Sequence, residues 1–174
     1  RCQEAVECYD KAIGIDPADA SVWFNRGNSL NKLQLCHEAV RSYDRAIDID
    51  PKDALAWYGR GNPLYVMKQY KEALESYDKA LALDPNTAGV WNNRGNTLAH
   101  LGRYQEAVYR YDKALIVEAN HHASIWYNRG TALHQTRDYQ NAVVSYGKAL
   151  SLEPNHAAAW NARGDALYML KRYE

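Results

Sequence analysis

The stretch that decides the fold is the segment WFNRGNSL at residues 23–30. It returns as WYGRGNPL at 57–64, WNNRGNTL at 91–98, WYNRGTAL at 126–133 and WNARGDAL at 160–167. The tryptophans lie 34 residues apart, except that the fourth arrives one residue late. A sequence that repeats at such a period predicts stacked copies of one small structural unit.

Each copy holds two stripes of apolar residues with helical spacing. With the tryptophan numbered as position 4 of a repeat, glycine and leucine recur at positions 8 and 11, on the same helix face. A second helical stripe follows, and in the first full copy it comprises Ala39, Val40, Tyr43, Ala46 and Ile47. Asp-Pro at 50–51 and 84–85 ends the second helix, because proline lacks a backbone donor and disfavours helical backbone before it. The sequence therefore predicts an all-α array of two-helix units that stack to bury both stripes.

These recurring residues also identify a family. Trp, Gly, Leu, Ala, Tyr, Ala and Pro at positions 4, 8, 11, 20, 24, 27 and 32 resemble a tetratricopeptide repeat (TPR) array of the bacterial type with Trp-x-Asn-Arg-Gly first helices. The resemblance covers the whole chain. It implies a right-handed superhelical α-solenoid of TPR helix-turn-helix repeats, with the first helices lining an inner groove. The array would comprise a lone second helix at 1–19, repeats at 20–53, 54–87, 88–122 and 123–156, and a lone first helix at 157–174, in one continuous array.

Two residues of the first helix disagree with local helix preference. Glycine at position 8 costs about 1 kcal/mol relative to alanine, and we predict that it makes room for the tyrosine at position 24, namely Tyr43, Tyr77, Tyr111 and Tyr146. The arginine at position 7 either binds a ligand or pairs with the aspartate at position 25 of the preceding repeat, and we favour the pair because it explains the regular spacing. The predicted pairs are Asp10–Arg26, Asp44–Arg60, Asp78–Arg94 and Asp112–Arg129, while Gly147 leaves Arg163 without this partner.

Composition and charge argue against several classes of function. Lys plus Arg equals Asp plus Glu at 21 each, so we expect neither a nucleic-acid nor a membrane partner. Three cysteines, Cys2, Cys8 and Cys36, do not form a disulfide framework and favour a cytoplasmic location. No catalytic constellation and no phosphate-binding glycine loop is present, which predicts a protein that is not an enzyme and needs no cofactor.

One segment departs from the repeat. EANHHASIW at 118–126 carries one extra residue and Ala119 in place of proline, which predicts a joint of different angle. His121 and His122 lie there, and His156 lies at the matching place one repeat later. We predict no metal site, since adjacent histidines lack the spacing that a built site needs.

The face expected to line the groove is rich in amides and aromatic rings. An asparagine amide can both donate and accept, as an extended peptide backbone requires, and rigid aromatic rings suit peptide recognition. The arrangement resembles the asparagine ladder of the O-linked N-acetylglucosamine transferase at Asn25, Asn93 and Asn128, broken at Gly59 and Ala162. It lacks the lysines and arginine of a carboxylate clamp. The candidate peptide-binding residues are Phe24, Asn25, Asn28, Tyr58, Asn62, Tyr65, Asn92, Asn93, Asn96, His100, Tyr127, Asn128, His134 and Asn161.

The sequence thus predicts a protein-protein interaction scaffold that binds an extended peptide of another protein. The alternatives are a structural, self-assembling array and a regulatory repeat region of a larger protein. The chain reads as a piece of a longer array, and its last helix carries Trp160, Leu167, Met169 and Leu170. We therefore also expect end-to-end self-association.

Overall fold

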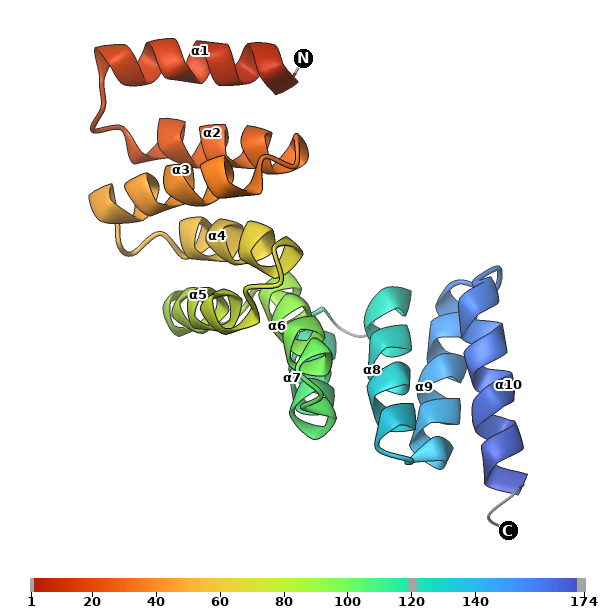
Figure 1. Ribbon diagram of the computed structural model, residues 1–174. Helices are drawn as coiled ribbons and strands as arrows, with labels where there is room; N and C mark the ends of the chain where they lie inside the picture. The colour runs from red at the N-terminus through yellow and green to blue at the C-terminus, as the bar shows by residue number, and fades with distance from the viewer. Residues whose placement is uncertain (1, 119–121, 172–174) are drawn as a thin grey trace. The chain divides into compact units, whose positions relative to one another are not determined.

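The computed structural model describes residues 2–118 and 122–171, and these contain ten α-helices (Figure 1). No β-strand occurs within these two ranges. The chain divides into two compact units, Arg1–Pro85 and Asn86–Glu174. No helix of the described residues is long and apolar enough to cross a lipid bilayer.

The first unit contains five helices, and each packs on the helix before it. They are α1 (Cys2–Ile15), α2 (Ala20–Lys32), α3 (Cys36–Ile49), α4 (Ala54–Val66) and α5 (Tyr70–Leu83). The alternate helices α2 and α4 also contact one another. Successive first helices of the repeat therefore meet within this unit.

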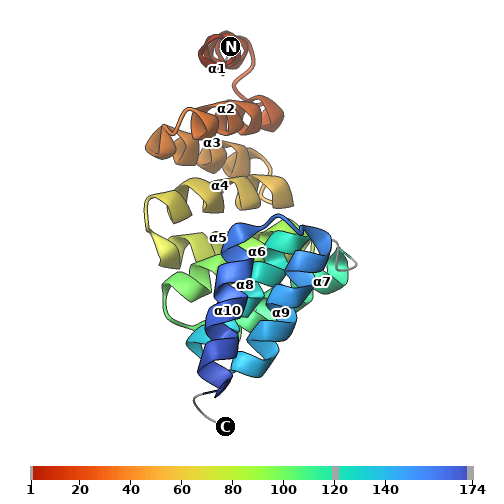
Figure 2. The same cartoon turned by 90° about the vertical axis from the view of Figure 1, so that its right-hand side faces the viewer.

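The second unit has the same arrangement. Its helices are α6 (Ala88–His100), α7 (Tyr104–Val117), α8 (Ala123–Gln135), α9 (Tyr139–Leu152) and α10 (Ala157–Lys171). The first helices α6, α8 and α10 contact one another in turn, and α8, α9 and α10 lie side by side (Figures 1 and 2). The predicted change of joint angle at 118–126, and His121, depend on residues 119–121, which lie outside the described residues.

The helix ends follow local signals. Asp19 accepts a hydrogen bond from the Ser21 backbone nitrogen at 2.9 Å and so caps α2, and Asp53 caps α4 in the same way. The turn inside each repeat holds one residue with left-handed backbone. Gly102, with φ of 73°, lies just after α6, where glycine commonly caps the end of a helix. Gln34, Lys68 and Arg137 adopt this backbone at φ of 61–64° without being glycine.

The predicted packing of glycine against tyrosine is confirmed. Tyr43 is 1% exposed, and a Cβ atom at Gly27 would lie 2.8 Å from its ring. The pairs Gly61–Tyr77, Gly95–Tyr111 and Gly130–Tyr146 repeat the contact. Real side chains do not tolerate such an approach, so the unfavourable glycine in the helix is the condition for burying the ring.

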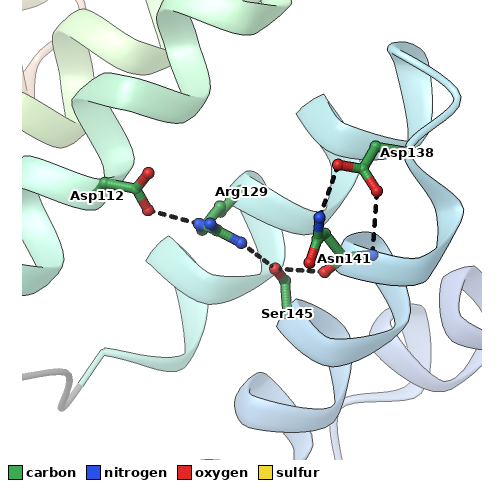
Figure 3. Close-up of polar contacts among 5 residues, drawn as sticks. All are labelled: Asp112, Arg129, Asp138, Asn141 and Ser145. Carbon is green, nitrogen blue, oxygen red and sulfur yellow. Dashed lines mark hydrogen bonds and ion pairs between the residues drawn. The ribbon is translucent and has the colours of Figure 1, made fainter.

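The arginine of the repeat joins three helices. In Figure 3, Arg129 on α8 donates through Nε to Asp112 on α7 at 2.6 Å and through Nη1 to Ser145 on α9 at 2.7 Å. The Ser145 hydroxyl in turn donates to the Asn141 carbonyl oxygen at 2.9 Å. We call this Asp–Arg–Ser set the arginine clasp. It fixes a first helix against the second helices on both sides.

The clasp recurs in the first unit and confirms two further predicted pairs. Arg26 bonds Asp10 and Arg60 bonds Asp44, each at 2.7 Å. Their serines are Ser42 and Ser76, each at 2.8 Å from the arginine. Asp78 and Arg94 belong to different units, so their pair stays a prediction. Arg163 has a buried Nε with no hydrogen-bond partner among the described residues, in line with Gly147 at the aspartate position.

Candidate functional site

All fourteen candidate residues lie on first helices of the repeat. They are distributed over α2, α4, α6, α8 and α10, and none of them is fully buried. Every one therefore keeps some surface for a ligand. What distinguishes them is how far their polar atoms are already engaged within the protein.

In the second unit the structure brings four of the candidates together. The Asn128 amide nitrogen on α8 donates to the side-chain oxygen of Asn96 at 3.1 Å and to that of Asn92 at 3.4 Å, both on α6. Asn92 donates in turn to the side-chain oxygen of Asn93 at 3.3 Å. We call these four residues the asparagine network. It links two successive first helices through side chains alone.

The network is anchored to the core. Asn96 accepts a second hydrogen bond at 2.8 Å from the hydroxyl of Tyr111, the buried tyrosine of the same repeat. Both acceptor positions of the Asn96 oxygen are then used. Among the described residues, the Asn96 amide nitrogen and the Asn128 amide oxygen make no hydrogen bond. Adjacent helices thus offer one donor and one acceptor on a half-buried surface.

The first unit keeps the anchor but lacks the bridge. The hydroxyl of Tyr43 donates to Asn28 at 2.8 Å, and that of Tyr77 donates to Asn62 at 3.0 Å. Gly59 occupies the place on α4 that Asn128 occupies on α8, so no amide reaches Asn28 from the next first helix. Asn25 is exposed and makes no hydrogen bond among the described residues.

Three candidate aromatic residues pack on the buried tyrosine of their own repeat. The ring centroids are 6.0 Å apart for Phe24 and Tyr43, 6.1 Å for Tyr58 and Tyr77, and 5.8 Å for Tyr127 and Tyr146. Burial raises the pKa of the Tyr58 phenol, which a hydrogen bond with Asn62 partly offsets. These rings are held in place before any ligand arrives, which lowers the entropy lost on binding.

Four candidates remain, on α4, α6, α8 and α10. Tyr65 packs on Tyr70 at 5.8 Å, and burial raises its pKa. The His134 ring meets the edge of Tyr139 at 5.1 Å. The Asn161 amide donates to Asp165 on its own helix at 3.3 Å. His100 is exposed on α6.

Sequence reasoning missed two sets of residues. The serines of the clasp recur at position 23, but a lone serine in a helix carries no signal until its arginine is placed. The bond from tyrosine to asparagine was also missed, although the two residues recur 15 apart, as in Tyr43 and Asn28. In the described part of the chain, no group of three or more His, Cys, Asp or Glu residues is placed to hold a metal ion.

Family models match along the chain. A model described as TPR repeat matches residues 1–34, 37–67 and 61–102. Two models described as tetratricopeptide repeat match residues 88–121 and 123–156. No curated protein matches the chain in sequence.

Solved structures match the fold. YrrB, described as a TPR protein with an unusual peptide-binding site, is 25% identical with a TM-score of 0.83, over 97% of this chain and 87% of that chain. MamA 41-end from Desulfovibrio magneticus RS-1 is 20% identical with a TM-score of 0.82, over 90% and 88%. A thermophilic TPR protein from Thermus thermophilus is 18% identical with a TM-score of 0.73, over 97% and 91%. The predicted all-α fold of TPR helix pairs is confirmed.

Proposed function

Because this chain belongs to the tetratricopeptide repeat family, we propose that it is a protein-interaction scaffold that binds an extended segment of another protein along its first helices. The repeats and the TPR neighbours support the scaffold role. YrrB is described as having a peptide-binding site, which supports the finer proposal of a peptide ligand.

The observation that carries the proposal is the pair of polar atoms left by the asparagine network. A peptide group has one N–H donor and one C=O acceptor. The Asn128 oxygen can accept from the first and the Asn96 nitrogen can donate to the second. Because amides read the backbone rather than a side chain, they would bind extended segments of varied sequence.

The nearby aromatic residues would add affinity. Tyr127 lies beside the network on α8 and its ring is fixed between Tyr146 and His156, at 5.8 Å and 4.9 Å. A rigid ring loses little conformational entropy when a peptide side chain packs on it. Asn161 on α10, in the same unit, would extend the surface for longer segments.

The charge of the chain favours a protein as the partner. Twenty-one cationic and 21 anionic side chains give no net field to attract a polyanion. We propose no catalytic role and no cofactor, since the surface offers amides and rings rather than an activated nucleophile or base.

A selection with random-sequence peptides tests this function. Peptides selected on the 174-residue chain are labelled, and their dissociation constants are measured by fluorescence anisotropy. Asn96→Asp keeps the acceptor for Tyr111 and Asn128 but removes the donor proposed for the peptide carbonyl. We expect Asn96→Asp to weaken binding at least about tenfold, the effect of losing a hydrogen bond and gaining a repulsive charge.

Matched variants separate binding from folding. Asn128→Ala removes the proposed acceptor and should weaken the same peptides, whereas Asn155→Ala, at an exposed turn residue, should leave affinity unchanged. Far-UV circular dichroism checks that each variant keeps its helices. Peptides that bind both network variants as tightly as the unaltered chain would contradict the proposed site.

A further inference from the structure

A pocket of about 430 Å³ lies on the side of α2 that faces away from the candidate peptide surface. At 100° per residue, the mean direction of Trp23 and Arg26 is about 160° from that of Asn25 and Asn28 around the helix axis. The lining residues come from α1, α2 and α3, all in the first unit, and are Asp10, Trp23, Arg26, Glu38, Arg41, Ser42, Asp44 and Arg45. Small-molecule sites have volumes of about 300–1,000 Å³, so this pocket has the size of one.

The Trp23 ring and an arginine clasp form a fixed wall of the pocket. The indole N–H of Trp23 donates to the Pro17 carbonyl oxygen at 3.0 Å. The guanidinium of Arg26 donates to Asp10 at 2.7 Å and to Ser42 at 2.8 Å. These hydrogen bonds hold the ring and the guanidinium in place before any ligand arrives, which lowers the entropy lost on binding.

Two charged side chains of the pocket are left unpaired by the rest of the protein. Glu38 and Arg41 lie one turn apart on α3, and neither side chain makes a hydrogen bond or an ion pair among the described residues. One turn further along, Arg45 pairs with Asp48 at 3.4 Å, and its guanidinium carbon lies 5.8 Å from the centre of the Trp23 ring. The pocket therefore presents one unpaired carboxylate and one unpaired guanidinium beside a fixed aromatic ring.

These opposite charges do not belong to the repeated frame. The residues at the places of Glu38 and Arg41 are both acidic on α5 and both uncharged on α9. They are Glu72 and Glu75 on α5, and Asn141 and Val144 on α9. Since α5 and α9 form the same helix without a pair of opposite charges, the fold does not need the pair on α3.

We propose that this pocket binds a free aromatic amino acid. The carboxylate of the ligand would pair with the Arg41 guanidinium, and its ammonium group would pair with the Glu38 carboxylate. The ligand ring would pack against Trp23 and the guanidinium plane of Arg45. Glu38, Arg41 and Arg45 follow one stripe of α3 at i, i+3 and i+7, so one small ligand can contact all three.

Nuclear magnetic resonance with L-phenylalanine as the probe tests the ligand class. The Trp23 indole N–H gives a signal in a nitrogen–proton correlation spectrum of the labelled chain, and Trp23→Phe assigns that signal by its loss. We expect phenylalanine to shift the signal to saturation. Phenylalaninamide lacks the carboxylate and N-acetylphenylalanine lacks the ammonium group, so each should bind at least about tenfold more weakly. These two compounds also mimic an aromatic residue at the start or the end of a protein chain, and so separate a free amino acid from a protein terminus.

Each charge of the pocket is then removed in turn. Arg41→Gln should weaken phenylalanine at least about tenfold and leave phenylalaninamide unchanged, because that compound has no carboxylate. Glu38→Gln should likewise weaken phenylalanine and leave N-acetylphenylalanine unchanged. Lys79→Gln removes an exposed cation at the place of Arg45 in the next repeat and is the matched control, which should bind like the unaltered chain.

The remaining signals of the same spectra show whether each variant keeps its fold. A Trp23 signal that phenylalanine does not shift would overturn the proposal. So would a phenylalanine affinity that Arg41→Gln leaves unchanged, or N-acetylphenylalanine or phenylalaninamide binding as tightly as phenylalanine.

Discussion

The helices α4 and α8 occupy equivalent places in their repeats, and the differences between them separate what the fold needs from what the surface does. Both keep the arginine clasp, through Arg60 and Arg129, and both keep the glycine that receives a buried tyrosine. Two differences between them are considered together. α4 has Pro63 where α8 has Ala132, and four residues earlier α4 has Gly59 where α8 has Asn128.

The two differences on α4 are connected. Proline inside a helix removes the hydrogen bond to the carbonyl four residues earlier and crowds that carbonyl. On α4 this carbonyl belongs to Gly59, whose backbone is the most permissive. On α8 it belongs to Asn128, which must hold its side chain toward α6. The helix α4 continues past Pro63 to Val66, while α8, which has no proline, holds the Asn128 amide within hydrogen-bond distance of Asn96.

The largest effect is expected from moving the proline into α8. Ala132 is 2% exposed and lies in the last turn of α8, so Ala132→Pro removes a backbone bond and crowds the Asn128 carbonyl. We expect a loss of about 3 kcal/mol or more in the free energy of unfolding. Urea unfolding followed by far-UV circular dichroism measures it.

The control for that exchange is Ala132→Ser, because Ser29 occupies the same place on α2. It should lower stability much less than the proline does. If Ala132→Pro were as mild as the serine variant, α8 would tolerate the backbone of α4, and the connection drawn between proline and glycine would be wrong.

The sequence predicts the glycine–tyrosine contacts and the aspartate–arginine pairs far better than it predicts the asparagine network. The contact of glycine with Tyr43 and the ion pair of aspartate with Arg60 follow from spacing, because each contact recurs along the chain. Each also joins groups that need one another, since a large ring needs space and a charged guanidinium needs a carboxylate. The Asn96–Asn128 bond joins helices whose distance and rotation no spacing reveals. Asparagine also has no compulsory partner, so its direction depends on the packed structure.

The next effect concerns the missing amide of α4. Gly59→Asn would give α4 the asparagine of α8, but its Cβ atom would lie 2.5 Å from the ring of Tyr43. Since that ring is buried and also packs on Gly27, it has little room to move. We expect a loss of about 1–3 kcal/mol in the free energy of unfolding, as for other overpacked cores.

Gly147→Asn serves as the control for this exchange, because an added Cβ there meets nothing within 4 Å. Its stability should change by less than that of Gly59→Asn in the same urea experiment. A neutral or stabilising Gly59→Asn would show that the first unit can accept the asparagine network, and that its absence there is not imposed by packing.

The smallest effect is expected in the turns that follow α4 and α8, and it should be the same in both turns. Equal effects would mean that the two regions differ in their helices and not in their turns. The turns that follow α4 and α8 place Lys68 and Arg137 in left-handed backbone, at φ of 61° and 64°. Glycine adopts this backbone without the strain of a side chain, as Gly102 does at the same place in its repeat. We expect Lys68→Gly and Arg137→Gly each to raise the free energy of unfolding by about 0.5–1 kcal/mol, less than the full left-handed penalty because glycine also gains freedom when unfolded.

The shift in urea midpoint measures both, and Gly102→Ala should shift it the opposite way. Unequal gains would mean that the turns also differ between the two regions, because identical backbone should respond identically.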